Sequence, residues 1–476
     1  MKKTYAIFII LLCTLAAYGQ DKETRAVWLT TVKSLDWPKT KATSPATVNQ
    51  QKRELTDMLD RLKAININTI LLQTRVRGTV IYPSAIEPWD ICLTGREGLT
   101  PGYDPLRFAI DECHKRGMKI QAWVVTLPLG KWKSIGCKQM RSKYPKAVKK
   151  LKDEGFLNPE SDKTADILAD ICSEIVRNYN VDGIHLDYMR YPDGWRVKSN
   201  RQQGRDNITR IVRKIYRSIK AVKSEVMLSC SPIGKYSDLT RYSSRGWNAR
   251  DAVCQDAQGW LKEGIMDQLY PMIYFKENNF YPFAADWAEQ CPDGRQVVSG
   301  LGTWMLDRRE GDWTLSEVIR QLNVSRQLGM GQCHFRAKFV LDNHQGVYDY
   351  LRLFNFPDCW KPQETDYNHL FVGFMPLSTA TVQAPETSPQ KPEQVNPAAV
   401  PLLKTDGKTL RLTPYPCANR YKTLIVKSLS GTTVAHLPVF SNSVAISSLP
   451  CGYYQAYTLD GKNNCHRIGF MKIERK

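Results

Sequence analysis

The stretch Val181–Pro192, VDGIHLDYMRYP, indicates both the fold and the position of its chemistry. A short apolar run ends there in a carboxylate, which aromatic, basic and proline residues follow. Side chains along a strand alternate between its two faces, so Gly183, His185 and Asp187 share one face. The stretch therefore brings a polar pair to the C-terminal end of a strand. A parallel β/α barrel carries its chemistry at that position.

Short apolar strands alternate with amphipathic helices from Arg25 to about Phe339. A repeating helical spacing of apolar residues, such as Leu55, Leu59 and Leu62, marks the helices. Eight strands separated by helices over roughly 300 residues predict an α/β fold, a (β/α)8 TIM barrel, rather than an open doubly wound sheet. The predicted strands are Ala26–Thr31, Thr69–Gln73, Lys119–Thr126, Gly183–Tyr188, Val226–Ser231, Met266–Tyr274, Gln296–Gly300 and Gly331–Phe335.

The N-terminal residues 1–19 are typical of an export signal. A basic pair precedes the apolar run Ala6–Ala17, and small residues precede a cut before Gln20. The run is too short for a comfortable membrane span, and no later stretch is long and apolar enough to cross a bilayer. Cys13 suggests a lipoprotein, but Leu12 before it is bulky. We expect export to the periplasm or cell surface of a bacterium.

The rest of the chain divides into three parts. Residues 20–376 are predicted to form the barrel domain, and the proline-rich residues 377–401 an extended linker. Residues 402–476 alternate like β-strands and contain an Asp460-Gly461 hairpin signal. They predict a small β-sandwich of the immunoglobulin or fibronectin type.

The chain is basic, with 67 Lys and Arg against 47 Asp and Glu, a net charge of +20. Nucleic acid, a membrane face and an acidic polysaccharide all fit this surplus, as does a basic surface with no particular partner. The charge is spread along the chain, with one short block at Lys143–Lys152. Thirteen cysteines show no CxxC pair and no Cys/His metal spacing, which favours buried free thiols for most of them and predicts no metal or cofactor.

Several blocks, in this order and spacing, resemble the glycosyl-hydrolase-like family 10, a group of exported bacterial barrel proteins. The resemblance implies hydrolysis of glycosidic bonds, and one branch of the family acts on peptidoglycan glycan strands stripped of their peptides. Two departures are Val125-Thr126, where the family usually has Asn-Pro, and the end of the sixth strand at Tyr274 to Glu277. The blocks are RAVWLT at Arg25, INTILLQTRVRGTVIYPS at Ile67, GMKIQAW at Gly117, LNPESDKTADIL at Leu157, VDGIHLDYMRYP at Val181, DQLYPMIYF at Asp267 and GQCHFRAK at Gly331.

Glycoside cleavage needs a proton donor for the leaving oxygen and a carboxylate that attacks the sugar or activates water. Asp187 is the candidate nucleophile or base, because the nearby cation Arg190 would hold it ionised. The alternative is a structural aspartate that caps the following loop. The match to the DGxDxDxE motif of family 18 chitinases is superficial, since Met189 replaces the final glutamate, which argues against substrate-assisted chitinase chemistry.

Glu277 is the provisional acid. It follows the sixth strand, where an apolar wall of Tyr274 and Phe275 would raise its pKa. The alternatives are that Glu277 is an exposed loop residue, or that Asp307 after the seventh strand is the acid. The changed end of the sixth strand leaves this assignment open.

Further side chains near the strand ends are candidates for substrate binding. Arginines there could grip hydroxyls or carboxylates, or could equally be structural partners of Asp187. Aromatic rings, including Trp123, could stack on sugars or belong to the core. His185 fits a hydrogen-bond partner inside the barrel better than a metal ligand. The candidates are Arg75, Arg77, Tyr82, His185, Arg190, Tyr274, Trp304 and Arg336.

Together these patterns predict an exported glycoside hydrolase that acts on a polysaccharide by a two-carboxylate mechanism. The basic charge favours an acidic polymer such as peptidoglycan glycan, and analogy with barrels that have a fourth-strand aspartate nucleophile favours retention. The competing class is a non-catalytic glycan-binding or scaffold protein. The export signal and the lack of a concentrated basic-aromatic motif argue against nucleic-acid binding. The sequence does not define the oligomeric state.

Overall fold

The computed structural model describes residues 23–197, 200–240, 246–355, 402–403, 408–411, 423–428, 433–438, 443–449, 452–459 and 465–473. By its contacts the chain divides into two units, Met1–Gln345 and Gly346–Lys476. The predicted signal sequence, linker and barrel boundary at residue 376 lie outside the described residues.

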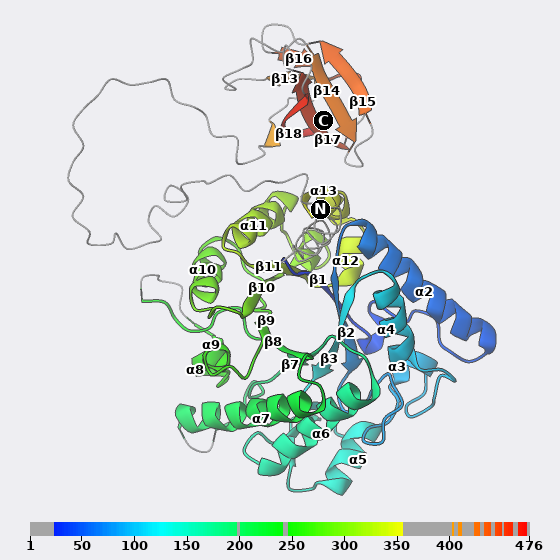
Figure 1. Ribbon diagram of the computed structural model, residues 1–476, viewed down its shortest axis with the longest axis vertical. Coiled ribbons are helices and arrows are strands. Elements are labelled where there is room, and N and C mark those ends of the chain that lie inside the picture. The colour runs from blue at the N-terminus through cyan, green and yellow to red at the C-terminus, as the bar shows by residue number, and fades with distance from the viewer. Residues whose placement is uncertain are drawn as a thin grey trace, which may run out of the picture. The chain divides into compact units, whose positions relative to one another are not determined.

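Eight parallel strands close into a barrel, and the last strand pairs with the first (Figure 1). This confirms the predicted (β/α)8 fold. The sixth strand is much shorter than the predicted Met266–Tyr274, since Pro271 has no N–H to donate to a neighbour and only isolated bridges at Met272 continue the pairing. The strands are β1 (Arg25–Leu29), β2 (Thr69–Arg75), β3 (Lys119–Val125), β7 (Gly183–Asp187), β8 (Met227–Ser231), β9 (Gln268–Leu269), β10 (Gln296–Leu301) and β11 (Gly331–His334).

Helices surround the barrel between successive strands (Figure 1). The first shows why they form: Ser44 caps it, and Leu55, Leu59 and Leu62 are buried as their spacing predicts. The helices are α2 (Pro45–Ala64), α3 (Ile91–Thr94), α4 (Pro105–Lys115), α6 (Asp162–Asn178), α7 (Arg201–Val222), α8 (Ala249–Ala252), α9 (Ala257–Lys262), α10 (Tyr281–Glu289), α11 (Leu315–Gln327) and α12 (Ala337–Leu341). The 3-10 turns are η1 (Val32–Ser34), η2 (Glu277–Asn279), η3 (Thr303–Leu306) and η4 (His344–Gly346).

A small antiparallel sheet interrupts the alternation after β3, and the sequence reasoning missed it. It contains β4 (Pro128–Lys131), β5 (Val148–Leu151) and β6 (Glu154–Leu157) in the order β4-β6-β5, with α5 (Ile135–Lys143) between the first two. Each of its strands is only four residues long, which leaves little alternation to detect.

The barrel interior is filled by side chains. A buried cluster includes Trp28, Trp123 and Tyr270, and polar groups lie among these rings. The strand register places Val125 beside Asp187 and Asp187 beside Ser231, so these residues reach the C-terminal end of the barrel together. This end is called the mouth below.

The second unit begins with α13 (Val347–Phe354) and contains two β-sheets around one apolar core. One sheet has the order β12-β18-β17-β14-β15, and β13 pairs with β16 in the other. The predicted immunoglobulin or fibronectin type stays a prediction. The strands are β12 (Leu402–Leu403), β13 (Thr409–Arg411), β14 (Thr423–Ser428), β15 (Thr433–Pro438), β16 (Ser443–Ala445), β17 (Gly452–Leu459) and β18 (Cys465–Ile473).

Eight cysteines in the described chain are free thiols, and seven of these are buried, which confirms the prediction for these positions. Within the described residues, no helix is long and apolar enough to cross a membrane. No group of three or more His, Cys, Asp or Glu side chains in that part of the chain is placed to hold a metal ion.

Candidate active site

Asp187 lies at the last position of β7, half-buried at the mouth. Its Oδ2 accepts a hydrogen bond from the indole Nε1 of Trp123 at 3.1 Å. Its Oδ1 accepts bonds from the backbone N–H of Tyr188 at 2.7 Å and the hydroxyl of Ser231 at 3.2 Å. These three donors fix the orientation of the carboxyl group toward the strand ends.

Burial raises the pKa of Asp187 above its usual range. The hydrogen bonds from Trp123, Tyr188 and Ser231 and the charge of Arg190 act in the opposite direction without cancelling the effect of burial. This corrects the expectation that Arg190 holds the carboxylate ionised. A carboxyl group with a raised pKa retains its proton to higher pH, which suits a proton donor.

Arg190 does not contact the carboxylate of Asp187 directly. Its guanidinium lies 4.0 Å from the ring centroid of Tyr188 and 5.2 Å from that of Trp247, and it pairs with Asp193 at 3.2 Å. Trp247 is 49% exposed. The sequence reasoning missed Trp247, although its position in a loop after the fifth barrel strand was a usable signal. It offers an aromatic face near the mouth.

Tyr274 brings a second aromatic surface to the mouth. Its ring is half-buried and lies 5.6 Å from that of Phe335. Its hydroxyl is buried and has no hydrogen-bond partner among the described residues. Burial, with smaller contributions from the charges of Cys333 and Asp187, raises the pKa of Tyr274 far above its usual range. The hydroxyl therefore stays protonated.

Trp304, a predicted stacking residue, continues this surface. It lies half-buried in η3, and its backbone N–H donates to the carbonyl of Phe335 at 3.1 Å. Its indole N–H is buried and, within the described residues, makes no hydrogen bond. Tyr274 and Trp304 thus bring two half-buried rings to the mouth, and each has a buried donor without a partner among the described residues.

Glu277 does not have the apolar environment that the sequence predicted for it. Glu277 lies in the exposed turn η2 with a positive φ of 50°, so the predicted apolar wall of Tyr274 and Phe275 does not enclose it. The alternative acid, Asp307, is bound by Arg309 at 2.7 Å. The hydrogen bonds from Arg309 hold the pKa of Asp307 well below its usual range, which does not suit a proton donor.

His185 lies below the mouth, fully buried inside the barrel. Its Nε2 accepts from the indole N–H of Trp28 at 3.1 Å, and its Nδ1 is 2.8 Å from the hydroxyl of Ser229. Burial lowers the pKa of His185 to about 3, so the ring is neutral. The predicted substrate contact is corrected, because both ring nitrogens are engaged within the core.

Arg75 and Tyr82 are also buried in structural contacts rather than free to bind a sugar. Arg75 pairs with Glu87 through two bonds of 2.6 Å, and its side chain is 0% exposed. The hydroxyl of Tyr82 donates to Glu174 at 3.3 Å. Both predicted substrate contacts are therefore corrected. Arg77 is exposed and pairs with Glu154 of β6 at 3.4 Å, beside the small antiparallel sheet.

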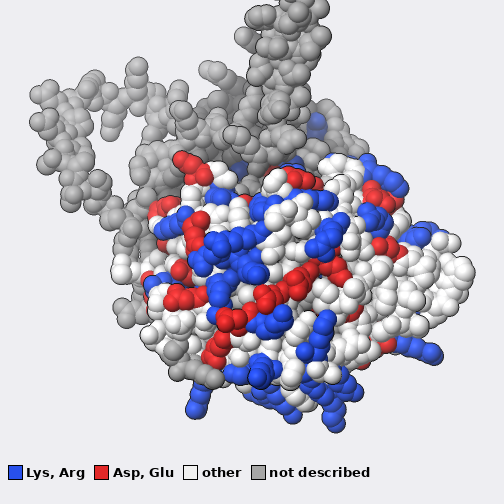
Figure 2. Space-filling view, turned by 60° about the horizontal axis from the view of Figure 1, so that its bottom comes forward, with Lys and Arg blue, Asp and Glu red and all other residues white. Residues whose placement is uncertain are grey.

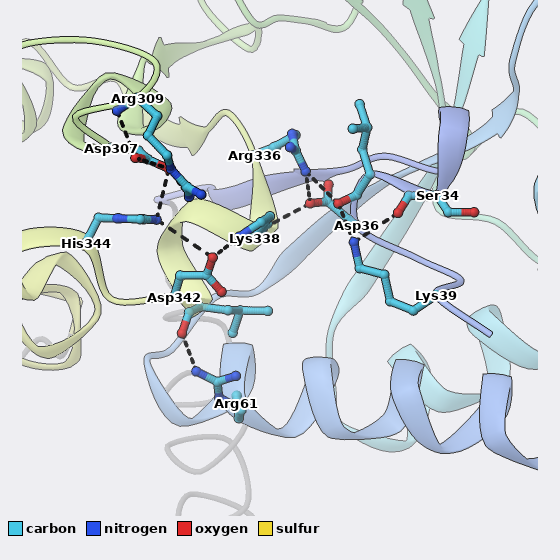
Figure 3. A network of polar contacts seen from close by, with 12 residues as sticks. Ser34, Asp36, Lys39, Arg61, Asp307, Arg309, Arg336, Lys338, Asp342 and His344 are labelled. Carbon is cyan, nitrogen blue, oxygen red and sulfur yellow. Dashed lines mark hydrogen bonds and ion pairs between the residues drawn. The ribbon is translucent and has the colours of Figure 1, made fainter.

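Arg336 belongs to a polar network that joins the loops after β1 and β11 (Figure 3). It pairs with Asp36, which is 2% exposed and also accepts from the backbone N–H groups of Thr30 and Lys338. These contacts use one nitrogen of its guanidinium, Nη1, so Arg336 has a structural role, and its predicted role in substrate binding stays a prediction. The network holds the loop that carries Phe335 against the mouth.

The fold and the mouth together define a (β/α)8-barrel protein with a protonatable carboxyl at the end of its fourth strand, among partly buried aromatic rings. This arrangement is typical of barrel enzymes. The chain belongs to the glycosyl hydrolase-like 10 family, whose model matches residues 23–202 and 195–297.

Sequence comparisons find relatives of this family. The chain is 29% identical to glycosyl hydrolase YngK of Bacillus subtilis, over 72% of this chain and 74% of that protein. It is 33% identical to glycosyl hydrolase DigH of Escherichia coli K12, over 64% of this chain and 79% of that protein. Among solved structures, the PgaB glycoside hydrolase domain of Bordetella bronchiseptica matches with a TM-score of 0.48 and 14% identity, over 70% of this chain and 98% of that one.

Proposed function

We propose that this protein hydrolyses glycosidic bonds at the mouth of its barrel, with Asp187 as the group that protonates the leaving oxygen. The observation that carries the proposal is a half-buried carboxyl with a raised pKa at the end of the fourth strand. Membership of the glycosyl hydrolase-like family and the names of the relatives support a glycan as the substrate. The raised pKa favours an acid over the nucleophile that the sequence suggested.

A second carboxylate is required if the substrate does not supply its own nucleophile. Three carboxylates in loops after other barrel strands are each bound by an arginine, which occupies their oxygens. Glu277 has no arginine partner within the described residues, so we assign it the second role, as the carboxylate that activates water. The roles of Asp187 and Glu277 are then exchanged relative to the sequence prediction. The bound pairs are Asp36–Arg336, Glu87–Arg75 and Asp307–Arg309.

For the substrate we propose peptidoglycan glycan strands stripped of peptides, or another acidic glycan, reached after export. One branch of the family acts on such strands, and the net charge of +20 favours a polymer that bears carboxylates. The half-buried rings of Tyr274 and Trp304 would line the sugar site, while the exposed ring of Trp247 would stack on a pyranose ring.

The test compares wild type with Asp187→Asn and Glu277→Gln on purified glycan strands and on nitrophenyl glycosides. A proton donor matters less when the leaving group is already acidic. Asp187→Asn should therefore lose about 10²–10⁴-fold in kcat/KM on glycan strands and much less on nitrophenyl glycosides. Glu277→Gln should lose activity on both substrates.

Three results would contradict the proposal. Equal losses for Asp187→Asn on both substrates would assign Asp187 a role other than acid. Full activity of Glu277→Gln would remove Glu277 from the mechanism. If wild type binds the strands and releases no reducing ends, the protein is the glycan-binding protein that the sequence left as the alternative.

A further inference from the structure

The segment Pro128–Leu157, called the basic excursion here, is strongly basic. Between Lys131 and Lys152 it contains eight lysines and one arginine, with no aspartate or glutamate. It folds into the small antiparallel sheet β4-β6-β5 together with α5. The sequence showed only part of this charge, as the short block at Lys143–Lys152.

The basic excursion is fixed beside the mouth. It leaves the C-terminal end of β3 next to Thr126, whose N–H and hydroxyl both donate to the backbone carbonyl of Asp187. It also packs on the loop after β2, where a side-chain carbon added at Gly136 would lie 1.9 Å from the carbonyl oxygen of Gly78. This close approach fixes α5 against that loop.

Most cations of the basic excursion have no acidic partner. Within the described residues, Lys131 pairs with Asp153 at 3.4 Å and Lys149 with Glu160 at 3.5 Å. Six further lysines are exposed, and none of them forms an ion pair in that part of the chain; they are Lys133, Lys138, Lys143, Lys146, Lys150 and Lys152.

Elsewhere on the barrel unit, acidic side chains offset the basic ones. Figure 2 brings forward the side that bears α6 and α7, where bands of Asp and Glu run between the Lys and Arg side chains. On α7, for example, Arg210 pairs with Asp162 and Arg213 with Glu263. The six unpaired lysines of the basic excursion therefore leave a local positive charge without internal neutralisation.

Aromatic rings hold several of these cations in place. The ring of Trp132 lies 4.4 Å from the guanidinium of Arg141 and 5.8 Å from the ammonium of Lys150. Lys149 lies 5.1 Å from the ring of Trp195, which follows β7. Such contacts restrict flexible side chains before any ligand arrives.

The same contacts narrow the choice of partner. The rings of Trp132, Tyr144 and Trp195 are half-buried and already carry cations, so they do not offer the free faces on which nucleic-acid bases stack. Within the described residues, the basic excursion exposes no large apolar side chain. It therefore has no side chain suited to insert into a membrane. Spaced exposed ammonium groups fit the spaced charges of an acidic polysaccharide.

We propose that the basic excursion binds the carboxylates of an acidic polysaccharide chain whose neighbouring sugars occupy the mouth. This inference rests on the proposed glycan-hydrolase function and adds a binding surface outside the catalytic residues. The lysines act through charge alone, so the binding weakens as salt screens them.

The test measures binding rather than cleavage, with the full chain bearing Asp187→Asn so that no substrate is consumed. The probe is polygalacturonate, and its fully methyl-esterified form is the uncharged counterpart. The test variant adds Lys146→Gln, Lys150→Gln and Lys152→Gln. A matched control instead adds Lys63→Gln, Lys119→Gln and Lys262→Gln, which removes the same charge from exposed lysines outside the basic excursion.

At low salt we expect the test variant to bind polygalacturonate about tenfold more weakly than the parent, and the control less than about threefold more weakly. The esterified polymer should bind weakly to all three proteins. Equal losses in the test and control variants would overturn the inference, since net charge alone would then explain binding. Tighter binding of single-stranded DNA or phosphatidylglycerol vesicles, with the same dependence on the three lysines, would also overturn it.

The two proposals fail separately. If Asp187→Asn leaves cleavage intact but the lysine variant loses binding, the catalytic assignment fails and the binding surface stands. If cleavage depends on Asp187 and the lysine variant binds like its control, the surface fails and the function stands.

Discussion

The ion pair between Arg75 and Glu87 provides the sharpest stability test. Arg75 donates four hydrogen bonds, two to the carboxylate of Glu87 and one each to the backbone carbonyls of Val125 and Thr126. The side chains are 0% and 2% exposed. Replacing Arg75 with methionine keeps most of the volume but leaves a buried carboxylate and two carbonyls without this donor.

The expected cost follows from this burial. Breaking a buried pair by removing one partner costs about 3–5 kcal/mol. For a large domain this corresponds to a fall in Tm of roughly 6 to 20 °C, at about 2–4 °C per kcal/mol. The double variant Arg75→Met/Glu87→Gln should recover part of the loss, because it removes the uncompensated charge. Circular dichroism during heating measures both.

A matched control separates structure from substrate binding. Arg77→Met removes an arginine whose pair with Glu154 is 52% and 34% exposed, so it should cost less than about 1 kcal/mol. If Arg75→Met unfolds at the wild-type temperature and only raises KM, then Arg75 is a substrate ligand and the structural reasoning is refuted.

Four further outcomes are expected. Wild-type kcat/KM should fall as pH rises through the raised pKa of Asp187, since the acid must be protonated; a fall toward low pH would indicate a nucleophile. The pKa of this carboxyl is higher in the folded than in the unfolded state, so rising pH between the two values favours the unfolded state. Asp187→Asn should therefore be more stable than wild type across that pH window and should lose this advantage in acid. Thermal melts at several pH values measure the difference. Gly136→Ala should lower the free energy of unfolding by about 1–3 kcal/mol, because the new carbon would meet the Gly78 carbonyl. The control Gly302→Ala makes only ordinary contacts. Equal melting temperatures of the two variants would contradict this reasoning. Trp247→Ala should raise KM several-fold with an unchanged Tm, and an unchanged KM would exclude it as a platform.

The barrel could be predicted from the sequence because each strand is a short apolar run between amphipathic helices. The exception was the sixth barrel strand, β9. The apolar run Met266–Tyr274 predicted a long strand, but Pro271 within this run has no N–H to donate, so the paired strand is short. The small antiparallel sheet gave no such signal. The sheet and α5 lie against Gly78 and Trp195, which belong to distant parts of the chain.

The candidate site was only partly predictable. Alternation along β7 placed Asp187 at the mouth, because the period of a strand is fixed. The partners of the other candidates depend on tertiary contacts that no local pattern encodes. Arg75 and Arg77 are two residues apart in the chain, yet one is buried against Glu87 and the other is exposed beside Glu154. The sign of the pKa shift of Asp187 likewise required knowing how burial compares with its hydrogen bonds.

The seam between β1 and β11 has a consequence for how the protein is made. Asp36 and Arg336, which fasten the seam, are separated by 300 positions. At a synthesis rate of about 5–20 residues per second, the first strand waits roughly 15 to 60 seconds for its partner. Throughout that interval one row of its backbone donors and acceptors is open to other chains. Newly made copies that crowd together are therefore at risk of joining through this strand, and a chaperone that covers the first 30 or so residues would reduce that risk.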